Sequence, residues 1–277
     1  MTMRTVGADI SHWEGEVVWS RGADYLPFCY YKATDGLDFI DSQFGNNMDG
    51  CNEFGVPHAP YHWWQELLDP IQQANFFVEI TKDGGYKKYI VDVEPRGNAD
   101  SAKLKLLLDR IEALTHTKPA IYTSSYYWSM VKPTPNWAYQ YDLLVAQYSY
   151  RFNPILPAGW STWKIWQFTD YFWFDGCNAT ADGNWFNGTL GECRNWFGNY
   201  KPYNPPPPSP DGRTKMIVIP DGLNVRSGPS TSYPVVSGLY KGEEIEVLDV
   251  DGYNSWVKHS KGWSAAGYYG KKYLQPK

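Results

Sequence analysis

The sequence contains no apolar run of about 18 residues, the length that a membrane-spanning helix requires. Its first strand-like segment starts at Val6, which leaves no room for a leader with a charged and then an apolar part. We therefore expect no signal peptide, and we do not expect a membrane to be the partner.

Cysteine is scarce as well: the 277 residues include four, and none of them belongs to a Cys-x-x-Cys pair. The five histidines also lack ligand spacing, because His58 and His62 fall on a strand-like stretch. Zinc sites are therefore not expected. Cys29 lies inside an apolar run and is expected to be a buried free thiol, whereas a bridge between Cys177 and Cys193 stays open.

An excess of positive charge is missing from most of the chain. Residues 1–200 carry 15 Lys and Arg against 23 Asp and Glu, a net of −8, and residues 201–277 carry 10 against 7, a net of +3. An acidic main part argues against nucleic acid as the partner. Serine-hydrolase chemistry is not expected either, since Ser124 and Ser125 follow a strand-like run without a Gly-x-Ser-x-Gly elbow.

Aromatic residues, by contrast, are abundant and make up 17% of the chain, with 14 Trp and 22 Tyr. That share exceeds what packing usually demands, and surplus Trp and Tyr often line grooves in which the flat apolar faces of sugars stack. Each of Trp13, Trp63 and Trp64 is open to either role, core packing or sugar stacking.

A proline-rich segment divides the chain. The stretch KPYNPPPPSPDG at residues 201–212 contains four consecutive prolines, which favour an extended polyproline II spacer of ~3 Å per residue. We therefore expect a large domain over residues 1–200 and a small one over residues 213–277. The small one has short segments such as MIVIP and WVKHSKGW, without a helical period, and is expected to be a small all-β barrel.

Short apolar segments with strand character recur eight times before the linker, and helical patterns lie between some of them. One pattern covers residues 70–81, with Asp69 as N-cap and Pro70 at the first helical position, and another follows Asp100 or Ser101. Strands that alternate with helices favour a parallel sheet, and eight of them favour a closed barrel. Because some connections are too short for a full helix, we expect an α/β fold, an irregular eight-stranded TIM-like barrel with degenerate helices.

Polar side chains cluster at the ends of these strand-like segments. In a parallel barrel the carboxyl ends of the strands form the mouth, where active sites lie. Several acids gathered at that end indicate an active site. The polar residues in question are Asp9, Lys32, Asp35, Asp92, Glu94, Gln147, Gln167 and Asp182.

Asp92 and Glu94 end an apolar run that reads YIVDVEP. Residues two apart on a strand share a face, with Cβ atoms about 6.6 Å apart. Two ionised carboxylates at that spacing repel by roughly 2–3 kcal/mol, or about two pKa units, so one should hold a proton near neutral pH. Glycoside hydrolysis needs such a pair: a protonated acid for the leaving oxygen and an ionised carboxylate on the other side. The alternatives are an ion-pair network with nearby cations and a hard-cation site formed with Asp9 and Asp182.

Eight motifs lie in register with the strand-like segments: GADISHWEG, YYKATDG, PYHWW, YIVDVEP, AIYTSSYYW, LLVAQYS, WKIWQFTD and DGNWFNGT. In this order they resemble the glycoside hydrolase family 25 lysozymes, which are N-acetylmuramidases. The resemblance covers residues 5 to about 195. It implies an irregular α/β barrel that cleaves the β-1,4 bond between N-acetylmuramic acid and N-acetylglucosamine in peptidoglycan.

The resemblance also implies roles for the residues at the strand ends. Glu94, the Glu of the family's Asp-x-Glu motif, would be the general acid, and Asp92 would orient or stabilise the 2-acetamido group of the substrate. Asp9 and Asp182 would complete the carboxylate cluster, and the choice between a nucleophile and a substrate-assisted route stays open. The family often has Glu where this chain has Asp35, so no catalytic role is expected there. The groove residues would be Tyr61, Tyr122, Gln147, Gln167, Lys32, Asp35 and Trp64.

The tail is similar to bacterial SH3 domains, which bind cell-wall peptides, most clearly in the turn LNVRSGPS. A barrel, a proline spacer and a wall-binding module together look like a phage endolysin, which stays in the host cytoplasm until holin lesions release it. Such a chain is expected to act as a monomer on peptidoglycan, with the glycan in the barrel groove and the peptide stem at the SH3 domain, without a cofactor. The alternatives are an autolysin exported by another route, a non-catalytic wall-binding protein and another polysaccharide hydrolase such as a chitinase-like enzyme.

Overall fold

The computed structural model describes residues 4–149, 152–201, 215–251, 256–265, 267–268 and 271–276 of the chain. The chain forms two compact units, residues 1–202 and 203–277, and each unit has a hydrophobic core of its own. The linker expected at residues 201–212 lies outside the described residues except for its first position.

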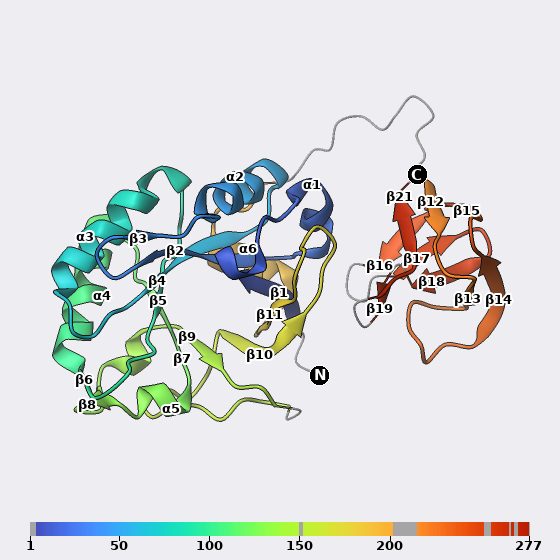
Figure 1. Ribbon diagram of the computed structural model, residues 1–277. Helices are drawn as coiled ribbons and strands as arrows, with labels where there is room; N and C mark the ends of the chain where they lie inside the picture. Colours follow the sequence, from blue (N-terminus) through green and yellow to red (C-terminus); the bar gives the residue numbers. More distant parts are fainter. Residues whose placement is uncertain are drawn as a thin grey trace. The chain divides into compact units, whose positions relative to one another are not determined.

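The first unit is a closed barrel of eight strands with helices around it, as the sequence predicts (Figure 1). The strand order is β1-β11-β10-β9-β7-β5-β4-β2, and a parallel pairing between β1 and β2 closes the barrel. A two-residue strand, β3 (Phe39–Ile40), pairs with β2 outside the barrel. The barrel strands are β1 Thr5–Ile10, β2 Cys29–Asp35, β4 His58–Trp63, β5 Ile90–Asp92, β7 Ala120–Thr123, β9 Leu143–Ala146, β10 Ile165–Phe172 and β11 Ala181–Phe186.

The last strand departs from the parallel sheet that the sequence pattern predicts. β11 runs antiparallel to both of its neighbours, β1 and β10. Residues 173–180 between β10 and β11 hold no helix, and such a short connection can only return the chain in the opposite direction. As a result the start of β11, with Asp182, lies at the same end of the barrel as the carboxyl ends of the other strands.

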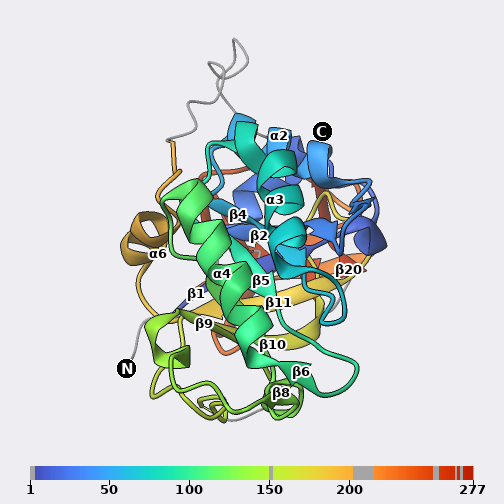
Figure 2. The ribbon, with the colours of Figure 1, turned by 90° about the vertical axis from the view of Figure 1, so that its left-hand side faces the viewer.

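Helices cover the barrel unevenly, which confirms the expected degeneracy. The two long helices α3 and α4 pack side by side (Figure 2). The α3 helix begins where the sequence predicts, because Asp69 accepts a hydrogen bond from the Gln72 amide at 2.8 Å, and Asp100 caps α4 through the Ala102 amide. The helices are α1 Trp19–Gly22, α2 Phe44–Phe54, α3 Pro70–Thr81, α4 Ser101–Thr115, α5 Ser125–Trp128 and α6 Leu190–Phe197. The 3-10 turns lie at His12–Glu14, Ala23–Tyr25, Lys82–Gly84 and Ala138–Gln140. Two short strands outside the barrel, β6 Ala99–Asp100 and β8 Val131–Lys132, form a parallel pair.

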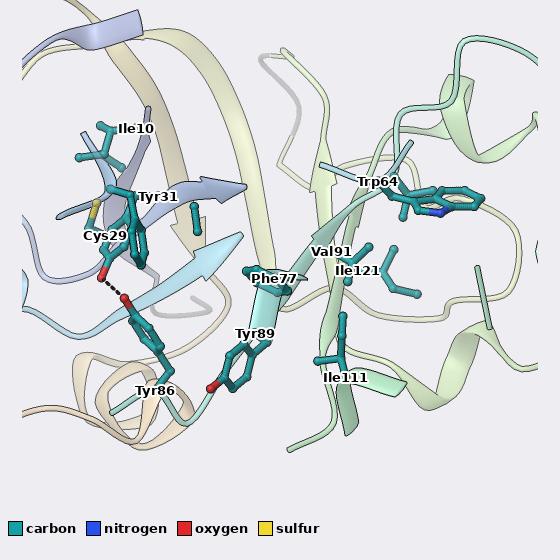
Figure 3. Close-up of a cluster of buried hydrophobic side chains, with 14 of the residues drawn as sticks. Ile10, Cys29, Tyr31, Trp64, Phe77, Tyr86, Tyr89, Val91, Ile111 and Ile121 are labelled. Carbon is teal, nitrogen blue, oxygen red and sulfur yellow. Dashed lines mark hydrogen bonds between the residues drawn. The ribbon is translucent and has the colours of Figure 1, made fainter. Parts of the chain in front are cut away.

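Large aromatic side chains fill the layer between the strands and the helices (Figure 3). Phe77 of α3 stacks on His62 of β4 and meets Tyr89 edge-on, with ring centroids 5.8 Å apart in the second pair. Tyr31 and Tyr86 share a hydrogen bond of 3.0 Å between their hydroxyl groups, which satisfies two polar atoms in a buried position. Part of the aromatic surplus therefore serves packing.

All four cysteines are free and buried. Cys29 is the buried thiol that its apolar surroundings predict, and burial raises its pKa well above the usual value. Cys177 and Cys193 do not pair with each other. Within the described ranges, no helix combines the length and the apolar character needed to cross a membrane.

The second unit consists of short strands, as expected for a small all-β domain. Its strands form one three-stranded sheet, one five-stranded sheet and one two-stranded pair. Its apolar core includes Val225, Leu239 and Val257. The strands are β12 Lys215–Val218, β13 Gly222–Arg226, β14 Val235–Tyr240, β15 Glu244–Glu246, β16 Asp249–Asp251, β17 Trp256–His259, β18 Gly262–Ala265, β19 Gly267–Tyr268, β20 Lys271–Lys272 and β21 Leu274–Pro276.

Candidate active site

A cavity of about 510 Å³ opens at the carboxyl ends of the parallel barrel strands. Asp9 enters it from the end of β1, Asp92 from the end of β5, and Glu94 from two residues further on. Asp182 reaches the same cavity from the start of β11, because that strand runs in the opposite direction. The structure therefore brings together all four acids that the sequence places at the mouth of the barrel.

Asp9 and Asp182 form one half of this carboxylate cluster. They stand opposite each other in the β1–β11 register, and the Gln167 side-chain Nε2 donates to Oδ2 of each at 3.0 Å. The Asn184 amide donates to the same Asp9 oxygen at 2.6 Å and accepts a hydrogen bond from the Tyr30 hydroxyl at 2.7 Å. Two amide donors on one carboxylate favour its ionised form, so these contacts hold the negative charge on Asp9.

Burial opposes ionisation of this pair. It raises the pKa of Asp9 to about 6, while the hydrogen bonds from Asn184 and Gln167 limit the rise. Burial and then the charge of Asp9 raise the pKa of Asp182 to about 8. Near neutral pH the pair therefore carries about one negative charge, on Asp9, and one proton, on Asp182.

Asp92 and Glu94 form the other half of the cluster. Burial and then the neighbouring Glu94 charge raise the pKa of Asp92 well above its usual value, and Asp92 Oδ1 is buried without a hydrogen-bond partner. Burial and then the Asp9 charge raise the pKa of Glu94 to about 7, against the effect of the Lys32 ammonium. Among the described residues, no group donates a hydrogen bond to the Glu94 carboxyl. Glu94 is thus a half-buried acid that is protonated about half of the time near neutral pH.

The spacing of Asp92 and Glu94 in the sequence predicts that their mutual repulsion raises the pKa of one of them. In the structure burial is the larger cause, and it raises the pKa of both Asp92 and Glu94. The two acids therefore hold protons to a higher pH than their spacing alone predicts.

Lys32 is the cation of the cavity. Its side chain is buried, its Nζ donates to Asp35 Oδ2 at 3.1 Å, and the same atom lies 5.0 Å from the centroid of the Trp63 ring. Asp35, which the sequence predicts as a groove residue, does not line the cavity. Its other oxygen accepts a hydrogen bond from Gln65 at 2.7 Å, so Asp35 acts on the cavity by positioning Lys32 and, through its charge, by helping to raise the pKa of Asp92.

The other predicted groove residues fall into two groups, those that line the cavity and one that is buried in the core. Four of them line the cavity as expected: Tyr61, Tyr122, Gln147 and Gln167. Trp64 does not, because its side chain has no exposed surface and packs in the core (Figure 3). The prediction selected the wrong member of the Trp63–Trp64 pair, since successive side chains on a strand point to opposite faces and Trp63 is the one that faces the cavity.

Several residues that line the cavity or contact its acids were not predicted from the sequence. Asn184 lies two positions after Asp182 on β11, so the two-residue period of a strand would have placed both on one face. Tyr30 shares a face of β2 with Lys32 for the same reason. Glu14, Tyr127 and Tyr148 line the cavity from a 3-10 turn, the short helix α5 and the segment after β9, which are too short to give a periodic signal.

The hard-cation site that the sequence leaves open finds no support here. Among the described residues, no group of three or more His, Cys, Asp or Glu side chains is arranged to hold a metal ion. Two of the four acids instead share the Gln167 amide, a donor that a cation would displace.

Comparison with known proteins agrees with this geometry. Residues 8–177 match the family described as glycosyl hydrolases family 25, and residues 221–269 match the bacterial SH3 domain. The chain belongs to glycosyl hydrolase family 25. The motif resemblance in the sequence is confirmed, and this family 25 chain is a glycoside hydrolase of the lysozyme type with a bacterial SH3 domain.

Relatives of this family 25 chain share its barrel at low sequence identity. It is 28% identical over 206 residues to the uncharacterized protein YegX of Escherichia coli O6:H1, and the matched region covers 70% of this chain and 74% of YegX. It is 25% identical over 209 residues to lysozyme M1 of Streptomyces globisporus, with 66% and 68% covered. The crystal structure of a lysozyme from Streptomyces coelicolor superposes with a TM-score of 0.64 at 24% identity, over 72% of this chain and 99% of the other, which shows the shared fold.

Proposed function

We propose that this enzyme hydrolyses the β-1,4 bond that follows N-acetylmuramic acid in peptidoglycan, with Glu94 as the general acid. The observation that carries the proposal is the state of Glu94, a cavity-lining carboxyl with a pKa of about 7 and no hydrogen-bond donor among the described residues. Such a group holds a proton near neutral pH and can pass it to the leaving glycosidic oxygen.

Asp92 supplies the second function of the pair. Its unpartnered Oδ1 is an acceptor that the protein leaves unused, and the N–H of a 2-acetamido group on the substrate is a donor that fits it. That hydrogen bond orients the acetamido oxygen toward the anomeric carbon. The negative charge held on Asp9 by Gln167 and Asn184 stabilises the positive charge that develops on the sugar ring in the transition state.

The carboxyl-terminal unit is proposed to hold the enzyme on its polymeric substrate. Bacterial SH3 domains match residues 221–269, and that unit contains a cavity of about 310 Å³ lined by Asn224, Arg226, Trp256 and other residues. A peptide stem is the part of peptidoglycan that such a polar and aromatic cavity suits. In this proposal the chain acts as a monomer on one wall.

The source of the chain is proposed to be a phage that uses it as an endolysin. The combination of a family 25 barrel with a bacterial SH3 domain supports this role, in which the protein stays in the host cytoplasm until a holin opens the membrane. Expression of the chain alone should then leave host cells intact, and co-expression with a holin should lyse them. Lysis without a holin would assign the protein to an exported autolysin instead.

Mass spectrometry of the fragments released from purified peptidoglycan tests the enzymatic proposal. We expect products with N-acetylmuramic acid at the reducing end. Products that end in N-acetylglucosamine, or faster cleavage of chitin oligosaccharides than of peptidoglycan, would support a chitinase-like enzyme. Wall binding without new reducing ends would leave only a wall-binding protein.

A further inference from the structure

The barrel has a second cavity of about 280 Å³ at the end opposite the carboxylate cluster. Its charged residues stand one or two positions before the parallel strands: Lys88 before β5, Lys118 before β7, Asp142 before β9 and Lys164 before β10. Asn187 joins them because it follows the end of the antiparallel strand β11. The volume lies just below the range of about 300–1,000 Å³ that holds drug-sized ligands, so a single small unit fits.

The charge of this cavity is opposite to that of the domain around it. Three lysines line it and Asp142 is the one acid in its lining, although residues 1–200 carry a net charge of −8. Asp142 is also engaged elsewhere, since the Trp196 indole donates to its Oδ2 at 2.6 Å and Lys88 Nζ approaches the same oxygen only to 3.8 Å. The cavity therefore has an excess of positive charge that its own acid does not neutralise.

Two of the three lysines lack the ion-pair partners that such a cluster usually has. Within the described part of the chain, Lys118 and Lys164 form no ion pair, and each lies near an aromatic ring, Tyr141 and Phe186 respectively. Burial and then the nearby Lys164 lower the pKa of Lys88, against the effect of Asp142. The repulsion between Lys88 and Lys164 is unfavourable by itself, and an anion bound beside them would offset it.

The uncharged wall of the cavity suits a sugar or a polyol. Tyr139 and Trp160 contribute aromatic surface, and Ser161, Thr162 and Asn187 contribute hydroxyl and amide groups. The wall is fixed in place, since the Trp160 indole donates to the Tyr141 carbonyl at 2.8 Å and Asn187 donates to the Trp163 carbonyl at 3.1 Å. Aromatic rings beside hydroxyl and amide groups are the usual surroundings of a bound carbohydrate.

We propose that this cavity is a second binding site of the barrel, for a sugar or polyol unit that carries a phosphate or a carboxylate. The lysines bind the anionic group, and the aromatic wall contacts the carbon skeleton. The site lies at the opposite end of the barrel from Glu94, so its ligand takes no part in hydrolysis and serves to attach the enzyme to an anionic polymer. The proposal does not depend on the reaction that the first cavity catalyses.

Isothermal titration calorimetry of the full chain at low ionic strength tests the site with three probes: glucose 6-phosphate, glucuronate and glucose. We expect the two anionic probes to bind and the neutral one not to bind. Any binding of these probes in the carboxylate-lined cavity should survive removal of the lysines of the second cavity. Comparison of glucose 6-phosphate with glucuronate decides whether the natural ligand is a phosphate or a carboxylate.

The variant Lys118→Gln/Lys164→Gln locates the binding. Neither lysine has a carboxylate partner in the described structure, so we expect an unchanged melting temperature and affinity for the anionic probe lower by about tenfold or more. The matched control, Lys103→Gln/Lys132→Gln, removes the same charge from α4 and β8 and should change the affinity less than about twofold. If the double variant has a lower melting temperature than the parent chain, the single variant Lys118→Gln replaces it in the test, because the Lys118 side chain is exposed.

Three outcomes would overturn the proposal. The first is equal binding of glucose and glucose 6-phosphate, which would remove the role of the charge. The second is an equal loss of affinity in the control variant, which would make the effect one of net charge. The third is the absence of binding for both anionic probes.

Discussion

Asp9 and Asp182 face each other across the antiparallel strands β1 and β11, and one side-chain amide, that of Gln167, donates a hydrogen bond to both. Like charges directly opposite in a sheet are unfavourable. The shared donor and the retained proton on Asp182 together make this arrangement stable near neutral pH.

Replacement of Gln167 by Met tests the shared donor. The variant keeps the volume of the side chain but loses one of the hydrogen bonds that lower the pKa of Asp9, so that pKa should rise. We expect the acidic limb of the pH profile of kcat/KM to move to higher pH. The free energy of unfolding should fall by about 1–3 kcal/mol, because the Tyr122 and Tyr148 hydroxyl groups also lose their acceptor.

Steady-state rates over a pH series and urea unfolding measure these two effects. The variant Gln140→Met, on an exposed 3-10 turn, serves as the control and should change neither quantity. An acidic limb that stays in place in Gln167→Met would show that the donor does not tune the cluster.

Glu94→Gln tests the proton donor. Glutamine keeps the shape of the side chain and has no proton to give, so the rate of reducing-end release should fall by about 10²–10⁴-fold while wall binding stays the same. The exposed substitution Glu53→Gln on α2 should leave the rate unchanged. A Glu94→Gln enzyme that keeps its lytic rate contradicts the assignment of the general acid.

Asp182→Asn tests the cost of the buried acid as a function of pH. Asp182 has a pKa of about 8 in the fold against 3.8 as the ordinary value, so between these pH values the folded protein holds a proton that the unfolded chain has lost. The Asp182 contribution to stability is therefore highest at low pH and declines as the pH rises from about 4 to about 8. Asparagine mimics the protonated acid and removes this decline.

The difference in unfolding free energy between Asp182→Asn and the parent chain should therefore shift in favour of the variant, by on the order of 2 kcal/mol, between pH 5 and pH 8. The buried histidines His58 and His62 have pKa values lowered to about 4 and give the opposite slope, but they cancel in the difference because both proteins contain them. Urea unfolding at several pH values measures the difference, and the exposed substitution Asp83→Asn should show no trend. A flat difference for Asp182→Asn would mean that Asp182 is ionised throughout.

Much of this molecule follows from local sequence signals. The eight barrel strands coincide with eight apolar segments, and Asp69 and Asp100 begin α3 and α4 through side-chain caps that are visible in the sequence. The convergence of Asp9, Asp92 and Glu94 follows too, because parallel strands in one barrel end at the same rim.

The remaining features depend on contacts that a sequence does not display. The direction of β11 is set by a connection without a helix, and only that direction places Asp182 and Asn184 beside Asp9. The choice between Trp63 and Trp64 follows from the register of β4, because a shift of one residue exchanges the two faces of a strand. The raised pKa of Asp92 comes first from burial, a property of the assembled fold.

Trp63, the last residue of β4, and Trp64, which follows it, should separate binding from stability. Trp63 lines the cavity and is only partly buried, so Trp63→Ala should weaken substrate binding, with KM higher by about tenfold, and should change stability little. Trp64 is fully buried, so Trp64→Ala should lower the free energy of unfolding by about 3–5 kcal/mol. Kinetics on soluble fragments and urea unfolding of both variants check this, and a reversed pattern would show that the register of β4 is wrong.

Removal of residues 213–277 tests the role of the second unit. The barrel has its own core, so the truncated enzyme should keep its rate on soluble peptidoglycan fragments within about twofold. On intact cells the rate should fall by about tenfold or more, since attachment to the wall raises the local concentration of enzyme near the glycan.

Binding measured without turnover separates attachment from catalysis. The full chain with Glu94→Gln should sediment with peptidoglycan that has been stripped of anionic polymers. The same variant without residues 213–277 should stay in solution, because the glycan groove alone holds one short segment and the lysine-lined cavity then has no ligand. Co-sedimentation of the truncated variant, together with equal lysis of cells by the truncated and full-length active enzymes, would show that the barrel finds the wall by itself. On walls that keep their anionic polymers, the lysine-lined cavity should also hold the truncated variant, and Lys118→Gln/Lys164→Gln should release it.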